Sequence, residues 1–323
     1  MNPWLIVALV FAFGALLSII IIAASPSNVD FSLDNTGWNG YSWLHELGAQ
    51  QIYTLEALPS STNNSVLIIP SPSREPEQNE IDLIKAFLLS GGTLIIANDY
   101  GYGNTWLRAL DICEAFLSSP ILDTVLFDSD IYLPKAMGYN RTVSLNIAVP
   151  INTSCIADKN AIVLLRTSVF SFIDENSNKQ KDENELEGPF VVAVMFNYGE
   201  GRLVLLGDPS IMINYMIEKE GNREFAESLL HSKQVYIYGG ALEETTLIKA
   251  KSSLSKVYNL LLSPELKYTL GLSLVIILTT LTSRLLFLYG KREKTPNVPD
   301  FIGLSEKELL MLRKDLREGG KHE

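Results

Sequence analysis

The stretch GGTLIIANDYGYGN, residues 91–104, indicates most directly how this chain folds. Thr93–Ala97 is a short apolar run, which is typical of a strand buried on both faces of a sheet. A polar turn with two glycines follows, and a helix is expected from about Thr105 to Phe116. In an open parallel sheet, the loops after the strands form the ligand crevice. Residues 98–104 are therefore expected to contribute to any site that the protein has.

The neighbouring segments extend this pattern. Val66–Pro70 is a second apolar strand, and Glu80–Leu89 is an amphipathic helix that leads into the strand at Thr93–Ala97. Two short apolar strands joined by one such helix predict a βαβ unit in a parallel sheet. Further apolar runs at Val125–Phe127, Arg202–Leu206 and Val235–Tyr238 predict additional strands. Ser168–Ile173 and Phe190–Phe196 are also apolar and flank an acidic loop, which predicts a hairpin. The expected fold class is α/β, with a mostly parallel central sheet.

Two apolar runs are close to the roughly 20 residues that a membrane-spanning helix needs. Trp4–Ala24 contains no charged residue, and Thr269–Ser283 continues as an apolar run past a single Arg284. A cleaved signal peptide is the alternative for the first run. However, no Lys or Arg precedes it and it exceeds a usual signal core, which favours an uncleaved anchor.

These runs divide the chain into five expected parts. They are an N-terminal transmembrane anchor (1–25), an α/β domain (26–240), a helical juxtamembrane stalk (241–265), a second transmembrane helix (266–290) and a charged tail (291–323). The last helix of the tail is expected at Ser305–Arg317.

The charge distribution predicts the orientation in the membrane. Residues 284–323 hold 9 of the 26 basic and 7 of the 37 acidic residues, which leaves a net charge of −13 for residues 25–283. Basic residues cluster directly after the second span, which predicts a cytoplasmic tail and an outside α/β domain. An acidic domain also lacks the basic surface that nucleic acid requires, so no nucleic-acid partner is expected.

Other signals fit an outside location but are weaker. Asn63, Asn140 and Asn152 each begin an N-x-[ST] glycosylation triplet, although such triplets also arise by chance. Cys113 and Cys155 could pair as a disulfide or remain a reduced buried pair.

The turn at residues 98–104 is placed like the nucleophile elbow of a hydrolase, but the required residues are missing. The elbow falls near Asp99 or Tyr100, and the chain has no G-x-S-x-G motif. Its three histidines, His45, His231 and His322, are not placed to activate a nucleophile. Covalent hydrolysis is therefore disfavoured, and binding or a purely structural turn remain as interpretations. The candidate ligand-binding residues are Trp38, Asn39, Ser71, Arg74, Asn98, Asp99, Tyr100, Tyr102, Asn104, Asp208 and Ser210.

An acidic stretch has the spacing of an EF-hand-type calcium loop. Oxygen-bearing side chains stand at positions 1, 3, 5, 9 and 12, with a backbone carbonyl at position 7. Lys179 replaces the usual glycine at position 6, and Lys181 replaces the apolar residue at position 8. A solvated acidic loop is the alternative to a structural Ca²⁺ site. The candidate ligands are Asp174, Asn176, Asn178, Gln180, Asp182 and Glu185.

Several short motifs in order resemble those of the DUF4350 family, a domain of unknown function found mostly in membrane-anchored prokaryotic proteins. They are GWNGYS (37–42), LIIP (67–70), GGTL (91–94) with DYGYGN (99–104), GPF (188–190), and GRL (201–203) with DPS (208–210). The resemblance spans roughly residues 28–235 and implies a flavodoxin-like fold of the class I glutamine amidotransferase-like superfamily.

The resemblance also implies a functional class. The family is similar to a membrane-associated, non-catalytic branch whose members are often encoded beside MoxR-type ATPases and DUF58 or transglutaminase-like membrane proteins. An active glutaminase needs a cysteine at the elbow with a His-Glu pair, and this chain has Asp99 and Tyr100 there. We therefore expect a non-enzymatic binding subunit of an envelope complex. The alternatives are a metal-assisted hydrolase of glycans or peptides, acting through Asp99 and Asp208, and an auxiliary subunit of an ABC-type transporter.

Overall fold

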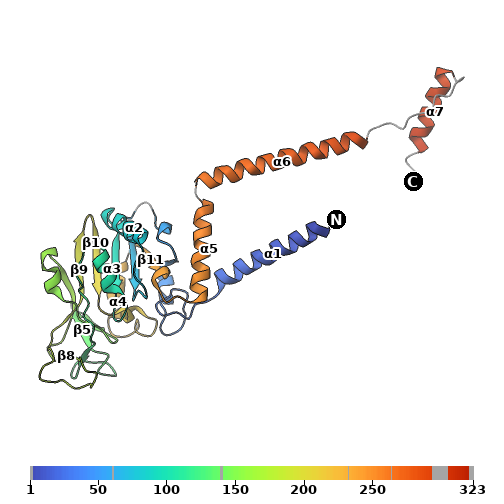
Figure 1. The fold of residues 1–323 in the computed structure, drawn as a ribbon. Helices are drawn as coiled ribbons and strands as arrows, with labels where there is room; N and C mark the ends of the chain where they lie inside the picture. The colour runs from blue at the N-terminus through green and yellow to red at the C-terminus, as the bar shows by residue number, and fades with distance from the viewer. Residues whose placement is uncertain are drawn as a thin grey trace. The chain divides into compact units, whose positions relative to one another are not determined.

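The computed structural model describes residues 3–59, 62–138, 141–231, 233–262, 264–292 and 305–319. The chain separates into two compact units, residues 1–262 and 263–323, and each is described here by itself. Unit 1 contains the α/β domain predicted from the sequence (Figure 1).

A mixed sheet of nine strands forms the centre of the domain, in the order β1-β11-β2-β3-β10-β9-β7-β5-β6. The first five strands in this order are parallel and the remaining pairings are antiparallel. The sheet is thus half parallel, less so than the sequence predicts. Its strands are β1 (Gln50–Ile52), β2 (Ser65–Pro70), β3 (Thr93–Ala97), β5 (Lys135–Gly138), β6 (Arg141–Ser144), β7 (Ile162–Thr167), β9 (Val191–Tyr198), β10 (Gly201–Leu206) and β11 (Gln234–Tyr238).

Helices cover both faces of the parallel half, because alternate residues of each strand point to opposite sides. On one face, Leu67 and Leu94 pack with α2 (Gln78–Leu89) and α3 (Gly103–Ala109). On the other face, Val66 and Ile95 belong to the cluster that includes α4 (Asn222–Leu230). All the residues of β2 and β3 are buried, as expected for strands covered on both sides. Five short 3-10 helices complete the domain: η1 (Ser42–Leu47), η2 (Leu55–Ala57), η3 (Thr153–Lys159), η4 (Pro209–Met212) and η5 (Gly239–Ala241).

The predicted βαβ unit is confirmed by the parallel pairing of β2 with β3 on either side of α2. Three local predictions were wrong. The helix expected over Thr105–Phe116 ends at Ala109, because Asp111 adopts a left-handed backbone (φ 60°) and Phe116 bridges to Ile151. The strand expected at residues 125–127 is instead β4 (Ile121–Asp123).

The third wrong prediction concerns a hairpin between residues 168–173 and 190–196. The first segment forms β8 (Ser171–Ile173), which pairs with β4 in a separate two-stranded sheet. The second segment forms β9, which pairs with β7 and β10. Both segments contain strands, but β8 pairs with a strand about 50 residues earlier, whereas β9 pairs with β10 directly after it and with β7.

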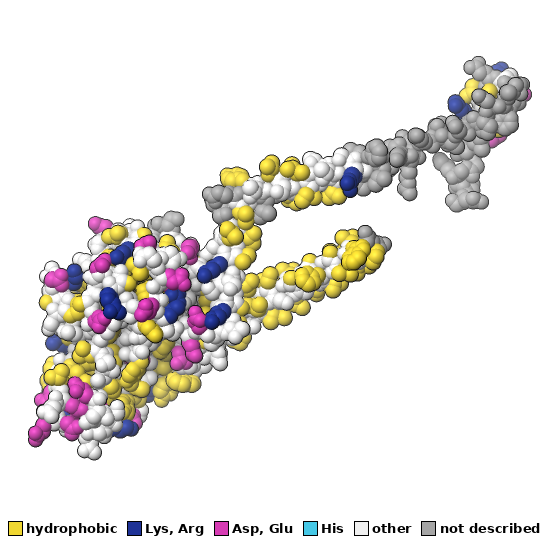
Figure 2. Space-filling model, viewed as in Figure 1, with side chains coloured by type: hydrophobic (Ala, Val, Ile, Leu, Met, Phe, Trp, Pro, Cys, Tyr) yellow, Lys and Arg dark blue, Asp and Glu magenta, His cyan; other side chains and the backbone are white. Residues whose placement is uncertain are grey.

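The N-terminal helix α1 (Pro3–Ala24) is apolar along its whole length and contains no buried residue (Figure 2). Its length and composition suffice to cross a membrane. In unit 2, α6 (Pro264–Arg292) contains a second such segment at Leu266–Arg284. The last helix, α7 (Glu306–Gly319), includes charged residues throughout and matches the predicted tail helix.

The helix α5 (Thr246–Leu262) is attached to the domain. The ammonium group of Lys251, a residue only 6% exposed, donates to Asp34 Oδ2 at 2.5 Å and to the carbonyl of Ser25 at 2.9 Å. Ile248 packs with Val29 of the segment after α1. The segment expected to be a juxtamembrane stalk therefore packs against residues 25–34, which follow α1.

Candidate functional site

The loops after β2, β3 and β10 lie side by side at the carboxyl edge of the parallel strands. The hydrogen-bond pattern of the parallel strands continues into these loops. The N–H of Ser71 donates to the carbonyl of Ala97 at 2.7 Å, and that of Asn98 donates to the carbonyl of Leu206 at 2.8 Å. The structure therefore brings Ser71, Asn98 and Asp208 to one edge, as the sequence predicts.

The glycine-bearing turn is held by its own packing. Asn98 is buried, and its side-chain oxygen accepts the N–H of Gly103 at 2.9 Å. A Cβ at Gly101 would lie 2.6 Å from the carbonyl oxygen of Pro72, and one at Gly103 would lie 2.5 Å from Asn98 Cγ. The N–H of Tyr102 donates to Pro72 at 2.7 Å. These glycines permit close packing, and two of the N–H groups that an anion would need are already used.

Asp99 occupies the elbow position and is also tied to its surroundings. Its Oδ1 accepts the hydroxyl of Ser71 at 2.9 Å and the N–H of Tyr100 at 2.7 Å. His45 lies in η1 and lines a hollow beside β1, and His231 ends α4. Among the hydrogen bonds of the described residues, none joins a histidine to Asp99. The described histidines therefore form no acid–base pair with Asp99, and His322 lies outside the described residues.

Asp208 is fully buried and serves the backbone. Its Oδ1 accepts the N–H of Ser210 at 2.7 Å, which caps η4, and its Oδ2 accepts the N–H of Asn146 at 2.6 Å. Burial, together with the charge of Asp99, raises the pKa of Asp208 well above its usual value, although the backbone hydrogen bonds oppose this. Ser210 is itself only 8% exposed. This carboxylate holds two loops together and offers no free oxygen to a ligand.

Arg74 turns away from Asp99 and enters a separate network. Its guanidinium pairs with both oxygens of Glu80, at 2.6 and 2.8 Å, and donates to the carbonyl of Gly240 at 3.0 Å. The hydroxyl of Tyr238 also donates to Glu80. Burial opposes ionisation of Glu80, but the hydrogen bonds from Arg74 and Tyr238 hold its pKa below the usual range. Arg74 therefore acts here as a structural partner.

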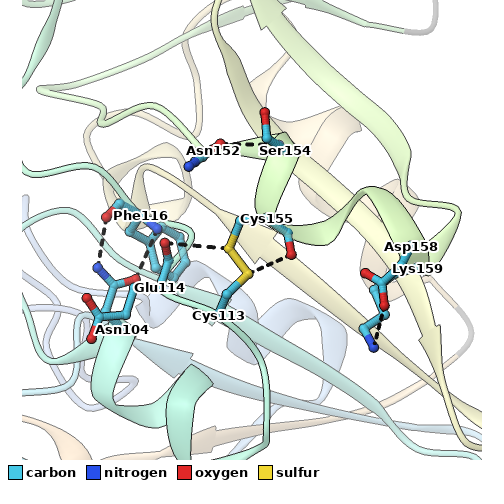
Figure 3. Close-up of a disulfide and its surroundings, with 9 residues drawn as sticks. All are labelled: Asn104, Cys113, Glu114, Phe116, Asn152, Ser154, Cys155, Asp158 and Lys159. Atoms are coloured by element: carbon cyan, nitrogen blue, oxygen red, sulfur yellow. Dashed lines mark hydrogen bonds and ion pairs between the residues drawn. A yellow bond between two sulfur atoms is a disulfide. The ribbon is translucent and has the colours of Figure 1, made fainter.

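Asn104 and Asn39 likewise make local contacts. The amide of Asn104 both donates to and accepts from the backbone of Phe116, at 2.8 and 3.0 Å (Figure 3). The side chain of Asn39 donates to Asp30 and accepts from Asn35. Neither amide reaches the turn after β3 through a hydrogen bond.

Several aromatic side chains in the loops of this domain are exposed to solvent. Trp38, Tyr100 and Tyr102 are 66%, 62% and 47% exposed. Tyr215 is 56% exposed, and its N–H donates to the carbonyl of Trp38 at 3.0 Å, which places the two residues next to each other. The sequence reading missed Tyr215, although it closely follows the Asp208-Pro-Ser motif. Burial, followed by Asp99 and Tyr132, raises the pKa of Tyr100, so its hydroxyl is neutral at physiological pH.

The acidic loop at residues 174–185 folds upon its own side chains. Asp174, 1% exposed, accepts the N–H groups of Asn178 and Lys179 at 3.1 and 3.2 Å. Lys179 has a left-handed backbone (φ 62°) at the position where an EF-hand loop carries glycine. The amides of Asn176 and Asn178 both donate to Asp182 Oδ2, and the two oxygens of Glu185 accept the N–H groups of Glu175 and Asp182.

The loop thus gathers five of its six predicted ligands by hydrogen bonds within the loop. Gln180 contributes only its N–H, which donates to the side chain of Asn178 at 2.7 Å. In the part of the chain that the structure describes, no group of three or more His, Cys, Asp or Glu side chains is arranged to hold a metal ion. Calcium binding stays a prediction.

Cys113 and Cys155 form a disulfide, with Cα atoms 6.0 Å apart (Figure 3). The bond lies at the surface and connects the segment after α3 with η3. Asn152 next to it is exposed and caps η3 by accepting the N–H of Ser154. Asn63 is also exposed, whereas Asn140 lies outside the described residues.

A family model described as "Domain of unknown function (DUF4350)" matches residues 34–230. No curated protein matches the chain. The solved structures similar to it include an "mmIFT52 N-terminal domain", at 15% identity over 50% of this chain and 74% of that one, with a TM-score of 0.39. A cytoplasmic protein of Salmonella typhimurium LT2, STM1381, is similar at 14% identity over 60% and 80% of the two chains, with a TM-score of 0.30.

A GH42 β-galactosidase, Gan42B, is similar at 16% identity, with a TM-score of 0.29. The match covers 53% of this chain but only 22% of the galactosidase. Likenesses this distant carry no functional argument.

Proposed function

The chain belongs to the DUF4350 family, and we propose that it is a membrane-anchored, extracytoplasmic domain that binds a partner protein as a subunit of an envelope complex. One observation carries this proposal. At the carboxyl edge of the sheet, the polar side chains are committed to internal hydrogen bonds, while Trp38, Tyr100, Tyr102 and Tyr215 remain exposed.

This combination supports recognition of a protein surface. Aromatic residues are enriched in interface centres, because a large ring buries much area and has few torsions to order. The loops that carry Tyr100 and Tyr102 are held by hydrogen bonds to Asp99 and Pro72, so little backbone freedom is lost on binding. A partner could therefore dock on this edge without rearranging it.

The same contacts argue against catalysis. A hydrolase acting through Asp99 and Asp208 needs carboxylate oxygens that can reach a substrate or metal. Both oxygens of Asp208 accept backbone N–H groups inside the core, and Oδ1 of Asp99 accepts from Ser71 and Tyr100, which leaves only Asp99 Oδ2 without a hydrogen bond among the described residues. A metal-assisted hydrolase is thus the less favoured function. We also propose the relation to the glutamine amidotransferase-like superfamily, supported by the parallel half of the sheet.

The proposed location rests on three features. Two helices are long and apolar enough to cross a membrane, and basic residues cluster after the second one. A surface disulfide favours an oxidising compartment, because cytosolic thiols are kept reduced. Together these support two spans, an outside α/β domain and a cytoplasmic tail.

The test is a mild-detergent pull-down of the full-length protein, analysed by mass spectrometry. The variant Trp38→Ala/Tyr100→Ala/Tyr102→Ala is expected to remain folded and membrane-inserted but to lose the co-purifying membrane proteins. Leu89→Ala is the matched control, because this exposed apolar residue ends α2, at the opposite edge of the sheet.

The identity of the partners decides between the possible complexes. MoxR-type, DUF58 or transglutaminase-like proteins would support the envelope complex, whereas a multi-span permease with its ATPase would identify a transporter subunit instead. Recovery of the wild type alone, as a monomer, would refute both. Equal recovery of partners with the triple variant and the control would refute the aromatic surface.

A further inference from the structure

A second candidate site lies at the opposite edge of the sheet, near the first residues of β3 and β10. It is a pocket of about 350 Å³ on the α4 face. The sheet explains why it is hollow: nine strands about 4.8 Å apart span about 38 Å, whereas one helix is only about 10 Å wide. α4 therefore leaves part of this face uncovered. Ser228 of α4 is among the residues that line it.

The charged residues of this pocket are all basic. Arg141, Arg202 and Lys233 line it, and none of its described lining residues is acidic. None of the three belongs to an ion pair in the described structure, and the ammonium of Lys233 donates only to the carbonyl of Leu229, at 3.1 Å. Burial and the nearby charge of Arg202 lower the pKa of Lys233, as expected for cations that face each other without a counterion.

Arg141 and Arg202 are exposed and Lys233 is half-buried, and other cations of the domain, such as Arg166, also form no ion pair among the described residues. Residues 25–283 carry an excess of 13 acidic side chains, and several other cations of the domain form ion pairs with them. Lys219 pairs with Asp128 at 2.6 Å, and Lys135 pairs with Glu220 at 2.5 Å. Glu220 and Glu224 do line a neighbouring hollow beside Arg141, but neither forms an ion pair with it. What distinguishes Arg141, Arg202 and Lys233 is that they line one pocket in which no described lining residue is acidic, so together they offer positive charge to an external anion.

The rest of the wall is apolar. It consists of the side chains of Leu164, Met195, Val204, Phe225 and Leu229. Val204 and Phe225 also belong to the buried core on this face of the sheet. Inorganic phosphate would neutralise the charge of the three cations but would leave the apolar wall exposed to water. A neutral apolar molecule would cover the wall but leave the cations unpaired. Only a molecule that combines both properties matches the whole surface, and the volume is within the range of small-molecule pockets.

We propose that this pocket binds a single-chain anionic lipid, with its headgroup at Arg141, Arg202 and Lys233 and its chain against the apolar wall. The site is separate from the aromatic surface of the carboxyl edge and does not depend on it.

The experiment is calorimetric titration of the full-length protein in phosphatidylcholine nanodiscs, with empty nanodiscs as the blank. Octyl phosphate is the main probe, and octanoate tests a carboxylate headgroup in parallel. Each methylene removed is expected to weaken binding about fourfold, so hexyl phosphate should bind about 15-fold more weakly. Inorganic phosphate and octanol should show no saturable binding below about 1 mM, because each satisfies only half of the pocket. Raising the salt concentration should weaken octyl phosphate binding.

The variants separate the pocket from general surface charge. Arg202→Met keeps much of the side-chain volume and should weaken octyl phosphate binding about tenfold. Arg166→Met is the control, because Arg166 is exposed on β7 and does not line the pocket. Ser228→Glu should also weaken binding while Ser228→Gln should not, and both variants should fold because this helix position is exposed.

Three results would overturn the proposal. The first is that neither octyl phosphate nor octanoate binds saturably up to about 1 mM. The second is that Arg202→Met and Arg166→Met bind octyl phosphate equally well. The third is that octyl phosphate and octanol bind equally well. Binding of octyl phosphate or octanoate that is weakened in both Arg202→Met and Ser228→Glu, but not in Arg166→Met, would support it, and the tighter of the two probes would identify the headgroup.

Discussion

Replacing both Cys113 and Cys155 by serine is expected to destabilise the α/β domain by about 3 kcal/mol. The disulfide closes a loop with a sequence separation of 42. That loop contains β4, β5 and β6, which begin the antiparallel part of the structure. Without the bond, the unfolded chain gains the freedom that the loop closure had removed.

The size of the effect follows from the length of the loop. The chain-entropy model gives about 4 kcal/mol for a loop of about 42 residues, and measured losses are usually about 2–4 kcal/mol. The segment is also held without the bond, because Asn104 binds the backbone of Phe116 and the N–H of Asn152 donates to Ala115. We therefore expect loss of stability without loss of the fold. For a domain of this size, the melting temperature should fall by roughly 6–12 °C.

The assay is thermal unfolding of the full-length protein in detergent, with and without a reducing agent. Reduction of the wild type should lower the melting temperature as much as the double substitution does, and the double variant should not respond to the reducing agent. Cys113→Ser alone should match the double variant. Alkylation and mass spectrometry of the unreduced wild type give the decisive check, because two free thiols there would refute the bond and its contribution.

Three further predictions concern ion pairs and the acidic loop. Lys251→Met is expected to cost about 2–3 kcal/mol in urea unfolding, because it removes two charge-assisted hydrogen bonds, and adding Asp34→Asn should cost little more; additive losses would contradict the coupling. The lowered pKa of Glu80 implies stability that is present above the unfolded value of about 4.3 and is lost as the pH falls through the folded pKa. The variant Glu80→Gln should therefore be less stable at pH 7, and its stability should fall less steeply at acidic pH. An unchanged pH dependence would show that the Glu80 carboxylate does not contribute to stability. If residues 174–185 bind calcium, Ca²⁺ should raise the melting temperature and Glu185→Gln should abolish the shift, whereas no shift in the wild type would exclude the site.

Much of the parallel half of the fold could be predicted from the sequence. β3 has the predicted bounds, Thr93–Ala97, because an apolar run between a glycine pair and a polar turn leaves little freedom in placing it. The antiparallel half was predicted less well. β4 pairs with β8 across about 50 residues, and nothing in either three-residue segment specifies that partner.

The candidate site could also be predicted only in part. The sequence placed Ser71, Asn98 and Asp208 at one edge of the sheet, because their strands are parallel and each of them follows a strand end. It did not reveal that Arg74 turns to Glu80, because that depends on where the first turn of α2 lies relative to the loop.

By itself, the sequence determined the two apolar helices, the acidic α/β domain between them and the absence of a nucleophile at the elbow, since these depend on local composition and periodicity. Only the tertiary structure decided which polar groups remain available. Asp99 and Asp208 look like site residues in the sequence, but hydrogen bonds use both oxygens of Asp208 and one oxygen of Asp99. Arg202 and Lys233 look like ordinary surface charges, yet folding gathers them in a pocket without a counterion. The physical reason is that a side chain's free bonding capacity depends on all its neighbours in space, most of which are remote in sequence.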